Sequence, residues 1–176
     1  GKTLGLIGVG KIGEEGAKVG SAFGMKVQAW SPNLTAERAL AAGVSFCPSK
    51  ETLLETSDWI SIHMVLSEST RGLIRAQDIA RIRSSSYFIN TSRSGLVDQD
   101  ALVAALREGR IAGAGLDVFD QEPLPEDHAF RTLPQVLATP HLGYVTEANY
   151  KMYFNEAVEN IHAYLAGSPV RLLTGL

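Results

Sequence analysis

Short apolar runs recur along this chain, and segments with helical periodicity or turn-forming residues separate them. Each run has the length of a buried strand and is far shorter than a membrane-spanning segment. The runs predict strands over residues 4–9, 26–30, 44–46, 59–63, 87–90, 112–118 and 136–139. The segments between them predict helices over residues 14–23, 35–42, 49–56, 76–82 and 98–108, and a long closing helix over 147–165.

Strands that alternate with helices are typical of a parallel sheet covered on both faces. We therefore predict an α/β fold with a doubly wound parallel sheet and helices on both faces. A length of 176 residues with 45% hydrophobic content suits one well-cored domain, so the span 1–176 is predicted as a single domain.

Three glycines stand directly after the first predicted strand, in the pattern Gly8-x-Gly10-x-x-Gly13. Such a pattern also occurs in ordinary loops, but a strand before it and a helix after it favour the dinucleotide-binding turn of a Rossmann fold. The first glycine would allow a tight turn, the second a close approach to a pyrophosphate, and the third packing of the helix on the strand. The backbone N–H groups of Lys11 and Ile12 would bind the phosphates. The domain 1–176 is thus predicted to bind a dinucleotide.

Polar groups also follow four later strands, at residues 63–67, 90–93, 117 and 139–141. Ligands of an open parallel sheet bind beyond the carboxyl ends of its strands, so we expect these groups to share one rim. His63, which ends a strand, is expected to bind backbone rather than substrate.

Composition excludes several other classes of protein. The net charge is -3 and no basic stripe with interleaved aromatics is present, so nucleic acid is not expected as a partner. Cys47 is the single cysteine and cannot form an internal disulfide, which fits a cytoplasmic location. No membrane-length run or leader is evident, so no membrane partner is expected. No spacing of His, Cys and carboxylates suggests a metal site.

Four motifs together are similar to those of the D-isomer-specific 2-hydroxyacid dehydrogenases, and they recur in the family order along essentially the whole chain. The motifs are Gly8–Gly13, Asn90–Asp98, Leu116–Pro123 and Thr139–Gly143. The resemblance implies a nucleotide-binding domain inserted into a substrate domain. The N-terminal part of that substrate domain is absent here, and the last residues would be its C-terminal return. The resemblance also implies a homodimer formed largely through cofactor domains, for which the loop 66–80 and the helix 98–108 could serve.

Reduction of a 2-keto acid requires a cation for the carboxylate and a proton donor for the carbonyl oxygen. Arg93 offers a fork of donors that matches a carboxylate, and His141 titrates near neutrality. Glu122 would favour the protonated ring of His141 and fix its tautomer. Each residue alone has an ordinary explanation, as an ion-paired arginine, a solvated glutamate or a packed histidine. All three match the family's catalytic motif positions, which favours catalysis.

The resemblance further implies hydride transfer between C4 of a nicotinamide and C2 of a D-2-hydroxy acid or 2-keto acid, of the glyoxylate, hydroxypyruvate or phosphoglycerate type. Formate is less expected, because formate dehydrogenases carry glutamine in place of Glu122. An NAD(H)-sensing interaction module of the corepressor type is the alternative, but a sensor would not require the arginine, glutamate and histidine set.

Further cofactor contacts are also implied by the resemblance. Asp117 would hold the nicotinamide carboxamide. The same ring would be lined by residues of two other segments, namely Thr91, Ser92 and Arg93 after one strand, and His141 and Gly143 after another. Met64 and Val65 would wall the adenine side, although apolar residues there could equally be core. Thr70 would reach the nicotinamide half, with a solvated loop hydroxyl as its alternative.

The cofactor is expected to be NAD or NADP. Ser31 stands after the second strand, where NAD-specific enzymes usually carry an acidic residue that repels a 2′-phosphate. No arginine directly follows Ser31 to attract a 2′-phosphate, and Arg38 lies a helical turn further along the chain. We therefore predict that both cofactors are accepted.

Overall fold

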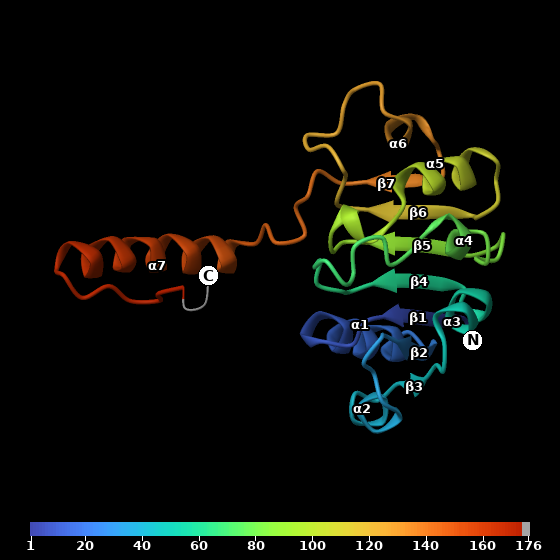
Figure 1. Ribbon diagram of the computed structural model, residues 1–176, viewed down its shortest axis with the longest axis horizontal. Helices are drawn as coiled ribbons and strands as arrows, with labels where there is room; N and C mark the ends of the chain where they lie inside the picture. Colours follow the sequence, from blue (N-terminus) through green and yellow to red (C-terminus); the bar gives the residue numbers. More distant parts are fainter. Residues whose placement is uncertain (174–176) are drawn as a thin grey trace. The chain divides into compact units, whose positions relative to one another are not determined.

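The computed structural model describes residues 1–173 and divides them into two units, Gly1–His141 and the residues from Leu142 onward. The first unit contains a seven-stranded sheet in the order β3-β2-β1-β4-β5-β6-β7, and all its strand pairs are parallel (Figure 1). The strands are β1 (Thr3–Ile7), β2 (Lys26–Trp30), β3 (Ser45–Phe46), β4 (Trp59–Ile62), β5 (Tyr87–Asn90), β6 (Gly113–Leu116) and β7 (Val136–Ala138). The predicted doubly wound parallel sheet is confirmed.

The helices agree with the predicted pattern except where they are very short. They are α1 (Lys11–Ala22), α2 (Ala36–Ala41), α3 (Lys50–Thr56), α4 (Ala76–Ile79), α5 (Gln99–Arg107), α6 (Ala129–Thr132) and α7 (Glu147–Leu165), with a 3-10 turn η1 (Ser94–Leu96). Neither η1 nor α6 was predicted, because three or four residues are too few to show a helical period. The ring of His128 stabilises the start of α6, since its Nδ1 accepts a hydrogen bond from the backbone N–H of Phe130 (3.2 Å).

Capping side chains explain where α2, α3 and α5 begin. Thr35, Ser49 and Asp98 each accept a hydrogen bond from the backbone N–H three residues later, at 3.2, 3.0 and 3.0 Å. Each bond satisfies one of the N–H groups that the first turn of a helix leaves without a partner.

Alternate residues of the strands face two separate apolar layers. Leu6 of β1 belongs to a cluster that includes Ala17 of α1 and Ala39 of α2. Ile7 points the other way, into a larger cluster with buried residues of α3, α4, α5 and α6. Because successive side chains of a strand point to opposite faces, the two clusters lie on opposite sides of the sheet. Helices therefore cover both faces of the sheet, as predicted.

The second unit consists mainly of α7, which coincides with the predicted closing helix. None of its 19 residues is buried. Arg171 folds back on this helix, where it pairs with Glu159 and donates to the side chain of Asn160 (3.0 Å). Among residues 1–173, no helix combines the length and the apolar character needed to cross a membrane.

Candidate functional site

All seven strands of the first unit are parallel and end at one edge of the sheet, and the arrowheads of β1 and β4 to β7 point the same way in Figure 1. The glycine turn follows β1, and Arg93 lies three residues beyond β5. Glu122 lies in the loop after β6, and His141 lies three residues beyond β7. The three predicted catalytic residues are thus all carried by segments that leave the carboxyl edge of the sheet, where ligands of such sheets bind.

The three glycines of the turn differ in the reason why glycine suits each position. Gly8 has a φ of +99°, and a Cβ there would lie 2.5 Å from the carbonyl oxygen of His63. A Cβ at Gly13 would lie 2.4 Å from the carbonyl oxygen of Gly8, so only glycine lets α1 pack this closely on the turn. Gly10 is different, because a Cβ there would meet no atom within 4 Å. The space at Gly10 is therefore open to a ligand.

A cleft of about 490 Å³ opens beside this turn. Its lining residues are Gly10, Lys11, Ile12, His63, Met64, Val65, Leu66, Thr91, Ser92 and Arg93. All of them except His63 and Leu66 were predicted to contact the cofactor. The start of α1 leaves backbone N–H groups without helical partners at this cleft, and its dipole favours an anion there. The open turn, the helix start and the size of the cleft fit a dinucleotide.

A network of hydrogen bonds holds the turn that carries Arg93. The hydroxyl of Ser92 donates to the carbonyl of Ile62 (2.7 Å), and the N–H of Ser92 donates to the side chain of Asn90 (3.0 Å). The amide of Asn90, which is buried, donates to the carbonyl of Arg93 (3.0 Å). The Arg93 side chain is exposed, and its Nη1 donates to the carbonyl of Ser92 (2.6 Å). This supporting role of Asn90 was not predicted.

Glu122 and His141 are in direct contact, although nineteen positions separate them. Nδ1 of His141 lies 2.7 Å from Oε2 of Glu122, and each side chain is about a third exposed. The other carboxylate oxygen of Glu122 accepts a hydrogen bond from the backbone N–H of Phe119 (2.9 Å). The carboxylate therefore accepts from Nδ1–H, so that proton exchange falls to Nε2 of the ring.

Opposing effects act on the pKa of Glu122. Desolvation by burial is the largest single effect, and it raises the pKa. The hydrogen bonds from His141 and from the backbone of Phe119, together with the charge of the imidazole, lower the pKa by more than burial raises it. The net pKa of Glu122 lies below its ordinary value, so the carboxylate is ionised near neutral pH.

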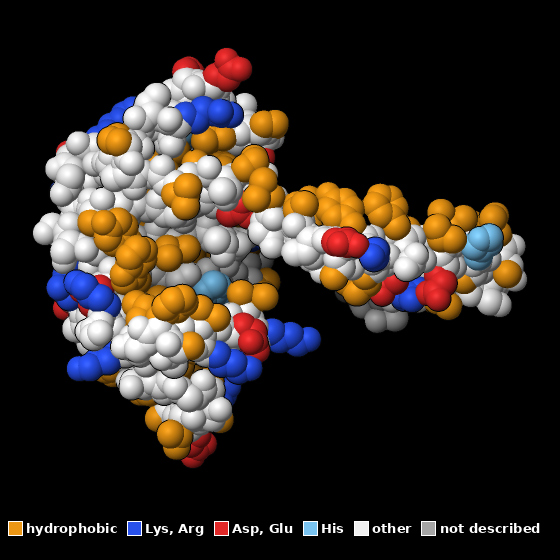
Figure 2. Space-filling view, turned by 180° about the vertical axis from the view of Figure 1, so that it is seen from behind, with side chains coloured by type: hydrophobic (Ala, Val, Ile, Leu, Met, Phe, Trp, Pro, Cys, Tyr) orange, Lys and Arg blue, Asp and Glu red, His pale blue; other side chains and the backbone are white. Residues whose placement is uncertain are grey.

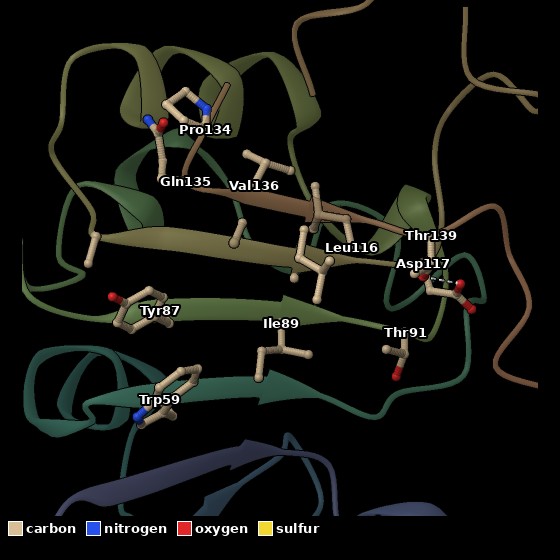
Figure 3. A pocket seen from close by; sticks show the side chains of 14 residues that line it. Trp59, Tyr87, Ile89, Thr91, Leu116, Asp117, Pro134, Gln135, Val136 and Thr139 are labelled. Carbon is tan, nitrogen blue, oxygen red and sulfur yellow. Dashed lines mark hydrogen bonds between the residues drawn. The ribbon is translucent and has the colours of Figure 1, made fainter. Parts of the chain in front are cut away.

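Asp117 follows β6 and is buried, with 4% of its surface exposed. It accepts a hydrogen bond from the hydroxyl of Thr139 (2.6 Å), and its N–H donates to the carbonyl of Asn90 (3.0 Å). Figure 3 shows Thr91, Asp117 and Thr139 at the ends of neighbouring strands. Thr91 lines both the cleft and a second, apolar hollow that includes Asp117.

Thr70 does not line the cleft. The alternative of a solvated hydroxyl is wrong, because only 9% of Thr70 is exposed. Its hydroxyl donates to the carbonyl of Val65 (2.7 Å) and accepts from the N–H of Ser67 (2.8 Å). Thr70 thus stabilises the segment that carries the cleft residue Val65.

Ser31 and Gly143, two other predicted cofactor contacts, do not line the cleft. Ser31 follows β2, and its carbonyl accepts a hydrogen bond from the N–H of Leu34 (3.1 Å). Arg38 reaches back over this loop, since its Nη1 donates to the carbonyl of Asn33 (3.1 Å). Gly143 belongs to the second unit.

His63 is a cleft residue that sequence reasoning assigned to backbone contacts. Its ring nitrogen Nε2 instead lies 2.9 Å from the hydroxyl of Ser61. Burial lowers the pKa of His63, which favours the neutral ring. The sequence could have indicated that His63 lies at the cleft, because this residue ends a strand at the predicted rim.

Comparison with known proteins agrees with this geometry. Residues 1–143 match the family described as D-isomer specific 2-hydroxyacid dehydrogenase, NAD binding domain. The chain is 41% identical over 170 residues to D-3-phosphoglycerate dehydrogenase of Bacillus subtilis, covering 97% of this chain and 32% of that protein. It is 42% identical over 164 residues to hydroxypyruvate reductase of Thermotoga maritima, covering 92% of this chain and 52% of that protein.

A solved structure of similar fold is the NAD complexed form of the D-isomer specific 2-hydroxyacid dehydrogenase from Lactobacillus delbrueckii ssp. bulgaricus. The TM-score is 0.82 at 31% identity, and the match covers 98% of this chain and 56% of that one. The chain thus spans between a third and somewhat over half the length of these relatives. On the family match and these relatives together, the chain belongs to the D-isomer specific 2-hydroxyacid dehydrogenase family, as its NAD binding domain.

Proposed function

We propose that this chain is the cofactor domain of a longer enzyme that interconverts a D-2-hydroxy acid and its 2-keto acid. The observation that carries the proposal is the 2.7 Å contact between His141 and Glu122 on segments that leave the same sheet edge as Arg93 and the glycine turn. An acid–base pair beside a dinucleotide cleft is what such a reaction requires.

Each of the three candidate catalytic residues, Arg93, Glu122 and His141, would have a separate role in the reaction. The guanidinium of Arg93 would bind the substrate carboxylate and polarise the neighbouring carbonyl, since its planar fork matches a carboxylate. The protonated ring of His141 would donate to the carbonyl oxygen in reduction and take the proton back in oxidation. Glu122 would hold that ring in its tautomer and stabilise its positive charge. NAD(P), when bound, supplies or accepts the hydride.

The remaining predicted contacts belong to the same proposal. The backbone at Gly10, Lys11 and Ile12 would bind the pyrophosphate, as the open space at Gly10 supports. Asp117 would orient the carboxamide, and Thr91, Ser92 and Gly143 would line the nicotinamide ring. Met64 and Val65, which line the cleft, would pack on the adenine side. Thr70 would act through Val65, whose carbonyl it binds.

The substrate class is a small acid such as glyoxylate, hydroxypyruvate or a phosphorylated analogue, in line with the names of the relatives. Their greater length supports a second domain that would supply the substrate pocket, with the residues from Leu142 onward as part of the return to it. We extend the proposal to a homodimer in the cytoplasm without nucleic-acid or membrane partners. The cofactor domain alone would lack the opposing wall of the cleft and turn over poorly.

The test uses the longer enzyme and its His141→Ala variant on a panel of 2-keto acids. We expect His141→Ala to lower kcat by about 10²–10⁴-fold, because that is the usual contribution of a positioned proton donor. NADH binding is measured in parallel by fluorescence. Equal turnover by both proteins, or no turnover by either, would count against the mechanism. NADH binding without any turnover would favour a sensing module instead.

For the cofactor we propose that both NADH and NADPH bind. No carboxylate stands at Ser31 to repel a 2′-phosphate, and Arg38 is held close to this loop by its bond to Asn33. Titration of the 176-residue chain with each cofactor checks this, with Arg38→Gln as the matched variant. We expect Arg38→Gln to weaken NADPH more than NADH. Rejection of NADPH by several hundredfold would refute dual acceptance.

A further inference from the structure

His63 follows the last residue of β4 and packs against the glycine turn. Its backbone N–H donates to the carbonyl of Ile7, the last residue of β1 (2.8 Å). A Cβ built at Gly13 would lie 3.8 Å from the Cβ of His63, and one built at Gly16 would lie 3.8 Å from its Nε2. The imidazole therefore lies against the first turns of α1, at the helix end whose N–H groups attract an anion.

The bond between His63 and Ser61 determines which ring nitrogen carries the proton. Ser61 is 6% exposed, and its hydroxyl lies 2.9 Å from Nε2 of His63. In the described part of the chain, this ring nitrogen is the only hydrogen-bond partner of the hydroxyl. A buried hydroxyl that donates to nothing is costly, so the Ser61 hydroxyl donates to Nε2. Burial lowers the pKa of His63 and favours the neutral ring, whose single N–H is therefore at Nδ1.

The Nδ1–H group of His63 is open to the cleft. Within residues 1–173, no buried side-chain nitrogen or oxygen lacks a hydrogen-bond partner. Nδ1 has no partner among these residues, because the one hydrogen bond of the His63 side chain joins Nε2 to Ser61. Nδ1 is therefore reached by solvent, and His63 is a lining residue of the cleft. The ring thus presents an N–H donor to the cleft, whereas its other nitrogen is satisfied within the protein.

The position of His63 in the sheet indicates which part of a dinucleotide it faces. Strand β4 lies between β1, which leads into the glycine turn, and β5, which leads into residues 91–93. The turn would bind the pyrophosphate, and the segment after β5 would line the nicotinamide ring. His63 leaves the strand between these two segments, and its ring packs against the helix start. The pyrophosphate is therefore the group expected beside His63, and its charged oxygens are strong hydrogen-bond acceptors.

We propose that His63 is a cofactor-binding residue whose neutral ring donates its Nδ1–H to a pyrophosphate oxygen of the bound dinucleotide, while the Ser61 hydroxyl holds the ring in this tautomer. The backbone N–H groups of Lys11 and Ile12 would bind the pyrophosphate from the side of the turn, and His63 would bind it from the side of the sheet. The inference rests on the cofactor site proposed above and deepens it. Each ring nitrogen has a separate role, since Nε2 stabilises the fold through Ser61 and Nδ1 binds the ligand.

Two substitutions separate these roles, because the amide of asparagine can replace Nδ1 and the amide of glutamine can replace Nε2. His63→Gln keeps a partner for Ser61 but removes the donor to the cleft. We expect it to weaken the binding of NADH to the 176-residue chain about tenfold, since a hydrogen bond to a charged group contributes that much. His63→Asn keeps the donor but leaves Ser61 without its partner. We expect its NADH affinity to stay within about threefold of the parent chain, while its urea midpoint falls below that of His63→Gln.

Two further measurements identify the acceptor and the tautomer. ADP and adenosine compete with NADH in titrations at about pH 8, where the ring of His63 is neutral. We expect His63→Gln to weaken ADP about tenfold and to leave adenosine unchanged, because only ADP carries the pyrophosphate. In the ¹⁵N-labelled chain, long-range ¹H–¹⁵N NMR is expected to show the proton of His63 on Nδ1 and a shift of the Nδ1 signal when NADH binds.

His162→Gln is the matched control. None of the residues of α7 is buried, and the helix is open to solvent along its length (Figure 2). His162 is exposed and does not line the cleft, so the same substitution there is expected to leave NADH affinity unchanged.

Four outcomes would overturn the proposed contact. They are an NADH affinity of His63→Gln within about twofold of the parent chain, an equal loss of affinity in both variants, a loss that adenosine also shows, and a spectrum with the proton on Nε2. Each of them leaves the proposed function intact as long as the parent chain binds NADH. A parent chain that binds no NADH would contradict the cofactor site and this contact together.

Discussion

At the scale of single residues, the backbone of His141 adopts a conformation that few side chains tolerate. Its φ is +53°, in the left-handed region, where histidine is one of the few non-glycine residues found more often. Its N–H donates to the carbonyl of Thr139 (2.9 Å), which helps to hold this turn. The turn presents the ring to Glu122, so the local strain and the candidate acid–base contact occur at the same residue.

The first prediction concerns the charge of Glu122. Glutamine in its place can still accept a hydrogen bond from Nδ1–H of His141 but cannot stabilise a positive ring. We expect Glu122→Gln to lower kcat for 2-keto acid reduction about 100-fold in the longer enzyme, with little change in KM. Steady-state kinetics checks this, and Glu126→Gln in the same loop is the control. A kcat within twofold of the parent enzyme would show that the charge is not needed.

The second prediction concerns His63, whose pKa burial lowers. The unfolded chain then binds a proton more readily than the folded one, so stability rises with pH. This contribution is present above the ordinary histidine pKa of about 6.5 and is lost as pH falls through the lowered folded value. We expect His63→Gln, whose amide can still bind Ser61, to flatten this dependence. Urea unfolding near neutral and mildly acidic pH checks it, and an unchanged slope would contradict it.

At the scale of elements, a buried carboxylate joins α3 to α4. Asp78 is 1% exposed and accepts hydrogen bonds from the ammonium of Lys50 (2.8 Å) and from the backbone N–H of Arg75 (2.8 Å). Lys50 also donates to the carbonyl of Leu73 (2.9 Å). The short helix α4 is thus stabilised by contacts with a residue far away in the sequence, and propensity alone would not predict it.

Removal of this carboxylate gives the third prediction. Asp78→Ala leaves the largely buried ammonium of Lys50 without its anion, and we expect a loss of about 3–5 kcal/mol in the free energy of unfolding. Glu55→Ala is the matched control, because it breaks an exposed pair with Arg81 (2.6 Å) and is expected to cost at most about 1 kcal/mol. Urea denaturation of both variants is the measurement. Equal losses would show that burial of the pair does not matter.

At the scale of the whole molecule, the two units differ in how they are stabilised. Both apolar clusters are formed by residues before Leu142, whereas α7 buries none of its residues. Free energy from apolar burial is therefore concentrated in Gly1–His141.

The fourth prediction follows from this division. A chain that ends at His141 is expected to unfold cooperatively with a free energy within about 1 kcal/mol of the 176-residue chain, because it keeps both apolar clusters. NADH binding is expected to persist, since every residue that lines the cleft lies before Leu142. Denaturation followed by circular dichroism and NADH titration are the measurements. Loss of cooperative unfolding would show that the second unit is required for the core.

Much of the fold could be predicted because its signals are local. Apolar runs, capping residues such as Ser49, and the glycines of the turn act within a few residues, so the sheet, the longer helices and the rim follow from the order of the chain. The extents of α4 and α6 could not be predicted, since Asp78 and His128 stabilise them through particular tertiary contacts. The motifs indicated the three candidate catalytic residues but not the hydrogen bonds that hold them.

By itself the sequence determined the parallel α/β architecture, the glycine turn and membership of the family, because each depends on local pattern. Only the tertiary structure decided that Glu122 and His141 touch and that Thr70 is buried, with its hydroxyl bound to the carbonyl of Val65. Contacts between distant residues depend on how strands and crossovers are ordered in space. A strand's own pattern shows that a residue is apolar, but not whether another element covers it.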